Sequence, residues 1–308
     1  MLAATRSATA RGATPRRPRL GVMKFASCDG CQLTLLDLED QFLEIVTAFD
    51  VVEFAEASSH RSSGPYDLVL VEGSISTPEQ IEEIIRIRRQ TPLLVTIGAC
   101  ATAGGIQALR NWRDHESMHQ AVYPLPEYVE SLATATPISD HVTVDAELRG
   151  CPIDPGQLLE LLTSLAVGRR PQLPDEAVCL ECKRRGKVCV LVAQDLPCLG
   201  PVTHTGCGAM CPAFDRGCYG CFGPREAANT TSLAAWFGRD GRPDAETAAL
   251  FSGFTAYAEP FRAVIDELGG PPRPPTGDDS LDGTPDTALG GTPDSAPGQG
   301  QEATDARH

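Results

Sequence analysis

The sequence predicts an α/β fold, in which a parallel, doubly wound sheet is followed by a small, irregular, cysteine-rich domain. Between residues 20 and 170, apolar runs rich in Val, Ile and Leu alternate with helical stretches. Such alternation is typical of a parallel sheet with helices on both faces. After residue 178, eight cysteines occur within 43 residues that contain few apolar side chains. A segment of that kind cannot build an ordinary hydrophobic core.

The expected elements follow from periodicity and from turn residues. Strands are expected at residues 20–27, 51–57, 67–73, 93–99 and 141–148. Helices are expected at residues 32–46, 77–89, 99 to about 110, and 155–167. Thr77 followed by Pro78 is a typical helix start. The order of the strands and the structure of loop 111–140 stay open. An apolar stripe over residues 244–268, interrupted at Pro260, is interpreted as packing or subunit contact.

Composition restricts the classes of function. The chain has 308 residues, twelve cysteines and a net charge of −15, which argues against non-specific nucleic-acid binding. No stretch approaches the ~20 apolar residues of a membrane span. Arg16-Arg17 precedes only a short apolar run that leads straight into Cys28, so an export signal is disfavoured and a cytoplasmic chain with reduced thiols is expected.

We expect four regions along the chain. Residues 1–18 and the acidic tail, residues 269–308, are expected to be disordered because they are rich in polar residues, Pro and Gly. Residues 19–170 form the sheet domain. Residues 171–268 form the cysteine-rich domain and its C-terminal helices.

Four cysteines follow the expected strands: Cys28, Cys31, Cys100 and Cys151. Ligands of open parallel sheets lie outside the carboxyl ends of the strands, so these thiols are expected to meet there. A redox pair at Cys28-x2-Cys31, four buried apolar side chains, a zinc site and a [4Fe–4S] cluster are the alternatives. The long separations in sequence favour a large cofactor on a preformed fold.

The other eight cysteines make two further sets of four. They are Cys179, Cys182, Cys189, Cys198, Cys207, Cys211, Cys218 and Cys221. Bound metal can supply folding free energy where a core is lacking. Zinc ribbons are one interpretation, but the proline after Cys211 is typical of iron–sulfur ligand runs. We therefore expect iron–sulfur clusters, with all twelve cysteines as ligands.

Several motifs together resemble the small, electron-transfer subunit of [NiFe] hydrogenases, most closely the cytoplasmic NAD(P)-linked type that includes the sulfhydrogenases. The motifs, within residues 20–225, are SCDGCQLTLLDLE, VEGSIS, IGACATAGGI, RGCPIDP and PCLGPVTHTGCGAMCPAFDRGCYGCFGP. The resemblance implies a flavodoxin-like domain that binds a proximal [4Fe–4S] cluster. It also implies that Glu72 lies near that cluster and helps to route protons; the alternative is a solvated loop carboxylate.

Carried over residue by residue, the resemblance implies three [4Fe–4S] clusters. The proximal ligands would be Cys28, Cys31, Cys100 and Cys151. The distal ligands would be Cys179, Cys182, Cys189 and Cys198, with Cys179 where periplasmic relatives have histidine. The medial ligands would be Cys207, Cys211, Cys218 and Cys221, with Cys211 where those relatives often have proline and a [3Fe–4S] cluster. Exchange of ligands between the last two clusters stays open.

The implied function is electron conduction between the Ni–Fe site of a large subunit and a flavin/NAD(P)-binding diaphorase subunit, with a further iron–sulfur subunit as partner. A small subunit of an F420- or heterodisulfide-reductase-linked hydrogenase is the main alternative. A related quinone-reductase subunit, which would carry two adjacent cysteines, and a stand-alone ferredoxin-like carrier are remote ones. Arg149 would offset cluster charge or face solvent, and His204 is not expected to be a ligand.

Overall fold

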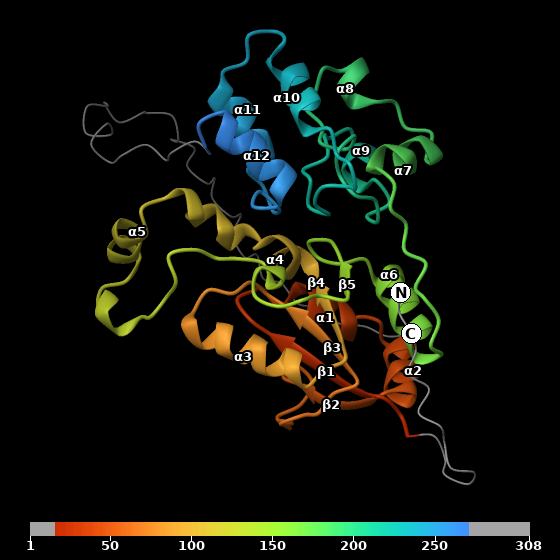
Figure 1. The fold of residues 1–308 in the computed structure, drawn as a ribbon. Coiled ribbons are helices and arrows are strands. Elements are labelled where there is room, and N and C mark those ends of the chain that lie inside the picture. The colour runs from red at the N-terminus through yellow and green to blue at the C-terminus, as the bar shows by residue number, and fades with distance from the viewer. Residues whose placement is uncertain (1–15, 271–308) are drawn as a thin grey trace, which may run out of the picture. The chain divides into compact units, whose positions relative to one another are not determined.

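The computed structural model describes residues 16–270, which belong to one compact unit. The predictions for residues 1–18 and 269–308 lie almost entirely outside the described residues. The division of the rest at residue 170 stays a prediction. Five parallel strands form one sheet (Figure 1). They are β1 (Arg19–Lys24), β2 (Asp50–Phe54), β3 (Leu68–Glu72), β4 (Leu93–Ile97) and β5 (Ala146–Leu148).

The strand order is β2-β1-β3-β4-β5. The chain moves from β1 to β2 on one side and then crosses to β3 on the other, so the sheet is doubly wound in the flavodoxin-like order. The predicted α/β class is therefore confirmed. All five strands present their carboxyl ends at one edge, which is where a parallel sheet of this order binds its ligands.

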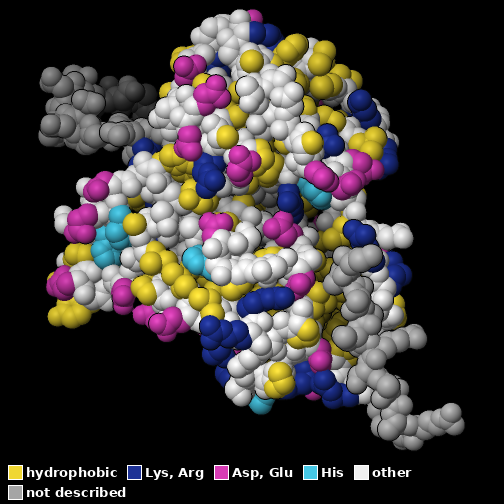
Figure 2. Space-filling model, viewed as in Figure 1, with side chains coloured by type: hydrophobic (Ala, Val, Ile, Leu, Met, Phe, Trp, Pro, Cys, Tyr) yellow, Lys and Arg dark blue, Asp and Glu magenta, His cyan; other side chains and the backbone are white. Residues whose placement is uncertain are grey.

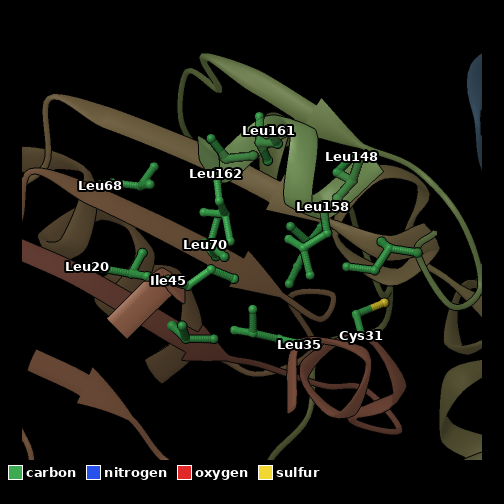
Figure 3. Close-up of a cluster of buried hydrophobic side chains, with 14 of the residues drawn as sticks. Leu20, Cys31, Leu35, Ile45, Leu68, Leu70, Leu148, Leu158, Leu161 and Leu162 are labelled. Atoms are coloured by element: carbon green, nitrogen blue, oxygen red, sulfur yellow. The ribbon is translucent and has the colours of Figure 1, made fainter. Parts of the chain in front are cut away.

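Side chains of β3 point alternately to the two faces of the sheet and contribute to an apolar cluster on each face. Leu68 and Leu70 belong to one apolar cluster, and Val69 and Val71 to the other. The first cluster is covered by α1 (Gly30–Leu36), α2 (Asp40–Ala48) and α6 (Pro155–Ala166). Figure 3 shows Leu35 of α1, Ile45 of α2 and the leucines of α6 packed against the strands. The second is covered by α3 (Pro78–Arg89). The helix starts at Thr77-Pro78, as expected from the sequence, and Thr77 and Gln80 form a capping box there.

Three expected elements differ from the prediction. The single helix at 32–46 is wrong: α1 closes where the backbone N–H of Asp37 bonds to Leu33, and Glu39, at φ 50°, starts a second helix. The helix after β4 ends early because Gly104 adopts φ 76°. β5 covers only the end of the expected strand.

The segment between β4 and β5 contains only short helices and 3₁₀ turns. It comprises α4 (Gly98–Ala103), the 3₁₀ helix η1 (Ile106–Trp112), α5 (His115–Val122), and the 3₁₀ turns η2 (Pro126–Tyr128) and η3 (Ile138–Asp140). Loop 111–140, which had no clear pattern, therefore contains helical turns that run across the sheet domain (Figure 1).

The cysteine-rich part contains short helices and then a small helical packing unit. The helices are α7 (Val178–Arg184), α8 (Val190–Ala193), α9 (Met210–Ala213), α10 (Thr230–Gly238), α11 (Asp244–Phe251) and α12 (Glu259–Glu267). Pro260 stands at the beginning of α12 instead of interrupting a helix. Phe237, Phe251 and Phe261 join these helices in one apolar cluster, as the packing interpretation expected. Among residues 16–270, every helix is too short or too polar to cross a membrane.

Candidate functional site

The first four predicted ligands gather at the carboxyl edge of the sheet. Cys28 lies between β1 and α1, Cys31 lies in α1, Cys100 lies in α4, and Cys151 follows β5. Cys31 is buried and Cys28 is exposed. In Figure 3 the Cys31 sulfur lies at the margin of the leucine cluster and points away from Leu35.

The proximity of these thiols appears in their acid–base properties. Burial, followed by the thiolates of Cys151 and Cys28, raises the pKa of Cys100 to about 11, although the Gln107 side chain opposes the shift. Burial also raises the pKa values of Cys31 and Cys151, and the thiolates of the same group add to both shifts. Four thiols within one another's electrostatic reach would repel as thiolates, and a bound cation would relieve that repulsion.

Two glycines leave the space around these sulfurs open. A Cβ atom added at Gly98 would lie 2.3 Å from the Cys31 sulfur, and one added at Gly105 would lie 2.7 Å from the Cys100 sulfur. Both glycines also have positive φ angles, 83° and 67°, which side chains disfavour. The donors are thiols alone, and the two glycines place no side chain beside the sulfurs. The residues present therefore fit an iron–sulfur cluster.

Glu72 ends β3 directly beside this group. Its two carboxylate oxygens accept the backbone N–H of Cys31 at 3.0 Å and the amide of Gln32 at 2.7 Å. The residue is only 2% exposed, and burial raises the pKa of its carboxyl. The alternative of a solvated loop carboxylate is therefore wrong.

Sequence reasoning missed Gln107, in η1. Its Nε2 atom donates to the carbonyl of Ala26 at 2.9 Å and lies 3.6 Å from the Cys100 sulfur. A side-chain amide is a hydrogen-bond donor that can stabilise a thiolate ligand. The sequence carries no signal for this contact, because it depends on the turn at Gly104 and Gly105.

Cys179, Cys182, Cys189 and Cys198 form the second group. Burial, followed by the thiolates of Cys198, Cys189 and Cys182, raises the pKa of Cys179 to about 11. A Cβ atom added at Gly200 would lie 3.3 Å from the Cys198 sulfur and 3.5 Å from the Cys179 sulfur. The structure therefore brings together the four residues predicted as distal ligands.

Cys207, Cys211, Cys218 and Cys221 form the third group. Burial, followed by the thiolates of Cys207, Cys151 and Cys211, raises the pKa of Cys221 to about 12. The second and third groups also touch, since the backbone N–H of Cys218 donates to the Cys198 sulfur at 3.2 Å. Both of these residues belong to a small core cluster with Val178, Val190 and Ala209, and Cys182 and Cys207 pack against it. Cysteine side chains thus make up a large part of this small core.

The third group also adjoins the first. After burial and Cys207, the thiolate of Cys151 helps to raise the pKa of Cys221. The ring of Phe222 lies between two glycines. A Cβ atom added at Gly150 would lie 2.9 Å from this ring, and one added at Gly206 would lie 2.6 Å from it. Each glycine directly precedes a predicted ligand, Cys151 or Cys207. Sequence reasoning missed Phe222 because the contact joins residues that lie far apart along the chain.

Polar side chains hold the same junction. Arg149 donates to the Pro224 carbonyl and pairs with Glu147 at 3.0 Å, so it is not a free surface charge. Glu181 accepts the backbone N–H groups of Gly206 at 3.1 Å and Ala209 at 3.0 Å. These two hydrogen bonds attach the loop that carries Cys207 to α7.

His204 contacts the backbone of its own loop, and its absence from the ligand sets stays a prediction. Its Nδ1 atom contacts the carbonyl oxygen of Thr205 at 2.7 Å, and burial lowers its pKa. Among residues 16–270, no three His, Cys, Asp or Glu side chains are arranged to hold a single metal ion.

Several known proteins with similar sequences are hydrogenase subunits. Residues 28–165 match the family described as "NADH ubiquinone oxidoreductase, 20 Kd subunit", and the eight later cysteines lie outside this match. Sulfhydrogenase 2 subunit delta of Pyrococcus furiosus is 37% identical over 67% of this chain and 86% of its own length.

Two further relatives carry different names. A vhu subunit of the F420-non-reducing hydrogenase of Methanocaldococcus jannaschii is 30% identical over 77% of this chain and 94% of its own length. NAD-reducing hydrogenase HoxS subunit delta of Cupriavidus necator is 27% identical over 53% of this chain and 90% of its own length. The chain belongs to the family of iron–sulfur, electron-transfer small subunits of [NiFe] hydrogenases, which are oxidoreductases.

Proposed function

We propose that this subunit conducts electrons through three [4Fe–4S] clusters, between the Ni–Fe site of a large subunit and a flavin/NAD(P)-binding diaphorase subunit. The observation that carries the proposal is the arrangement of twelve thiols in three adjoining groups. Cys151 of the first group lies within electrostatic reach of Cys221 of the third, and Cys218 of the third donates to Cys198 of the second. The groups therefore form a continuous series.

Each group would hold one cluster. The proximal cluster would be bound by the cysteines at positions 28, 31, 100 and 151, the distal by those at 179, 182, 189 and 198, and the medial by those at 207, 211, 218 and 221. When bound, such clusters accept and release single electrons at potentials set by burial and by hydrogen bonds to sulfur.

The chain's other residues would position these ligands. Gln107 would donate to the Cys100 sulfur, and Phe222 would keep the first and third groups apart. Glu72 would hold the loop of Cys31 and help to route protons, and burial raises the pKa of its carboxyl.

The name of one relative, an NAD-reducing hydrogenase subunit, supports a diaphorase as the electron acceptor. Another relative is a sulfhydrogenase subunit. A cytoplasmic complex with a large subunit, a diaphorase and a further iron–sulfur subunit fits this assignment. A heterodisulfide-reductase-linked complex is the second candidate, because the F420-non-reducing relative matches over a larger share of this chain.

Metal analysis of the anaerobically purified complex tests the cluster assignment. About twelve irons and twelve sulfides in this chain, with nickel confined to the large subunit, are expected for three [4Fe–4S] clusters. About four irons together with zinc would mean that residues 179–221 form a zinc module, and conduction beyond the first group would be excluded. Hydrogen-dependent reduction of NAD+ or NADP+ by the complex then distinguishes the diaphorase from the second candidate.

A further inference from the structure

A run of basic residues lies between two predicted distal ligands. Lys183, Arg184, Arg185 and Lys187, which we call the basic collar, occupy the stretch from Cys182 to Cys189. No acidic residue interrupts them, although the chain as a whole carries a net charge of −15. A local charge opposite to the net charge needs a cause beyond solubility.

The collar faces solvent. All four of its side chains are exposed. Arg184 makes only a 3.8 Å contact with Glu176, and Arg185 donates to the carbonyl of Gly208. Within the described part of the chain, neither Lys183 nor Lys187 forms an ion pair. Two cations therefore remain free to meet another molecule.

Apolar side chains stand beside the collar. Val188 and Val192 are 67% and 76% exposed, Leu196 is 38% exposed, and Cys189 itself is exposed. Figure 2 shows dark blue and yellow side chains together at the edge where Figure 1 draws α7 and α8. An apolar centre with a charged rim is the usual anatomy of a protein–protein interface.

We propose that this surface docks an electron-carrying protein through an acidic face of that protein. The inference rests on the proposed function, because it assigns the electron exit to the group of Cys182 and Cys189. Charge complementarity would steer the encounter and orient the carrier over Cys189. Docking itself makes and breaks no covalent bond.

A protein fits this surface better than an anionic nucleotide does. Nucleotide sites are concave and bury most of their ligand. The side chains of Val188 and Val192 instead stand out from the surface. Electron-transfer encounters use small, weakly held interfaces of less than about 1,200 Å², and a short segment such as this one can supply part of such an area.

A second explanation is that the collar only offsets the charge of the thiolates. Lys187 does lower the pKa of Cys182, against the larger effect of burial. Charge offset predicts a change in cluster potential but no preference for an acidic carrier. Docking predicts binding that depends on the carrier's charge and on salt, because the Debye length falls from about 10 Å at 0.1 M salt to about 3 Å at 1 M.

The test uses the anaerobically purified complex of this chain with its large subunit, immobilised for binding measurements. The probes are an acidic [2Fe–2S] ferredoxin and a basic c-type cytochrome, each at salt concentrations from 0.05 to 0.5 M. The variants are K183E/K187E, the conservative K183R/K187R, and R89E, which reverses another exposed arginine on α3. Iron and sulfide content are measured for each preparation.

The dissociation constant for the ferredoxin should rise about tenfold or more with salt, and about tenfold in K183E/K187E at low salt. K183R/K187R and R89E should bind as the wild type does. Equal affinity for both carriers, salt-independent binding, or binding of NAD+ or NADP+ that K183E/K187E abolishes would overturn the proposal. If K183E/K187E loses iron, the salt dependence and the carrier preference of the wild-type complex still test the proposal. Wild-type complex without iron would instead refute the proposed function.

Discussion

The carboxylate of Glu72 accepts the backbone N–H of Cys31 at 3.0 Å, although 41 positions separate the two residues along the chain. Gln32 donates to the other oxygen at 2.7 Å. The end of β3 is thereby tied to the first turn of α1. Both donors are buried, so the loop that presents Cys28 and Cys31 depends on this one acceptor.

Replacement of Glu72 by alanine should therefore destabilise the chain by about 3 kcal/mol, because two buried donors lose their acceptor. Glu72→Gln should cost only about 1 kcal/mol. The Oε1 atom of Gln32 has no hydrogen-bond partner within the described residues, so the Gln32 amide can turn over and accept from the new side chain. Anaerobic urea denaturation followed by circular dichroism measures both changes. Glu82→Ala, on the exposed face of α3, is the control. Equal losses of unfolding free energy in the two Glu72 variants would contradict the role of Glu72 as the shared acceptor.

The contact between Phe222 and Gly206 leads to a second prediction. Gly206→Ala should destabilise the chain strongly, by about 3 kcal/mol, through overpacking and an unfavourable φ of 144°. The added Cβ would lie 2.4 Å from the Gln157 side chain and 2.6 Å from the Phe222 ring.

Gly168→Ala is the matched control for this prediction. Gly168 also has a positive φ, 69°, but an added Cβ would meet nothing within 4 Å. That variant should lose only about 1–2 kcal/mol. The midpoint of urea unfolding distinguishes the two variants, and similar losses would show that backbone strain, and not the Phe222 contact, dominates at Gly206.

The sheet could be predicted from the sequence because its signals are local. The strands are continuous apolar runs, and Thr77-Pro78 starts α3 where a cap and a proline coincide. Cysteines that directly follow strands had to reach the carboxyl edge once the sheet was parallel. The grouping at that edge was therefore accessible before the structure.

Other features depend on conformation or on contacts between distant residues. The break between α1 and α2 follows from the positive φ of Glu39, which periodicity does not reveal. Phe222, Glu181 and Gln107 act on partners in other segments, so the sequence around them carries no signal. The contact between Cys198 and Cys218 likewise depends on two loops meeting, which is why spacing alone leaves the last two ligand sets open.

The amide of Gln107 should raise the reduction potential of the nearest cluster, because a hydrogen bond to a ligand sulfur stabilises the reduced, more negative state. Gln107→Leu should therefore lower that potential by about 20–60 mV, which corresponds to ~0.5–1.5 kcal/mol for a one-electron couple. Potentiometric titration followed by EPR measures the shift. Gln120→Leu on α5 is the control, and an unchanged potential in Gln107→Leu would contradict the contact.

His141 should make stability depend on pH. Burial lowers its pKa, and its Nε2 atom lies 2.7 Å from the Thr136 hydroxyl. Unfolded histidine binds its proton near pH 6.5, so the unfolded chain takes up protons that the folded chain rejects. The stabilisation is present above about pH 6.5 and is lost as the pH falls toward the lowered pKa of the folded state.

His141→Gln should flatten this decline between pH 5 and 7, as seen in urea midpoints measured at half-unit pH intervals. His60→Gln, at an exposed position, should leave the decline intact. If both variants behave like the wild type, other groups control stability in this range.

Cys211 provides the most direct test of the third ligand group. Burial, followed by the thiolates of Cys207 and Cys198, raises its pKa, so its thiol lies within the group, at the start of α9. Cys211→Ala should remove one ligand while the other three keep three irons in place. The iron content should then fall from about twelve to about eleven per chain.

The expected spectroscopic signature of Cys211→Ala is a [3Fe–4S] EPR signal after mild oxidation, absent from the wild type. Ala213→Ser, in the same short helix, is the control and should change neither iron content nor spectrum. Unchanged iron and spectrum in Cys211→Ala would remove Cys211 from the ligand set. Loss of four irons would instead mean that this cluster needs all four thiols to assemble, because the sulfurs here stand where a core would otherwise hold the loops.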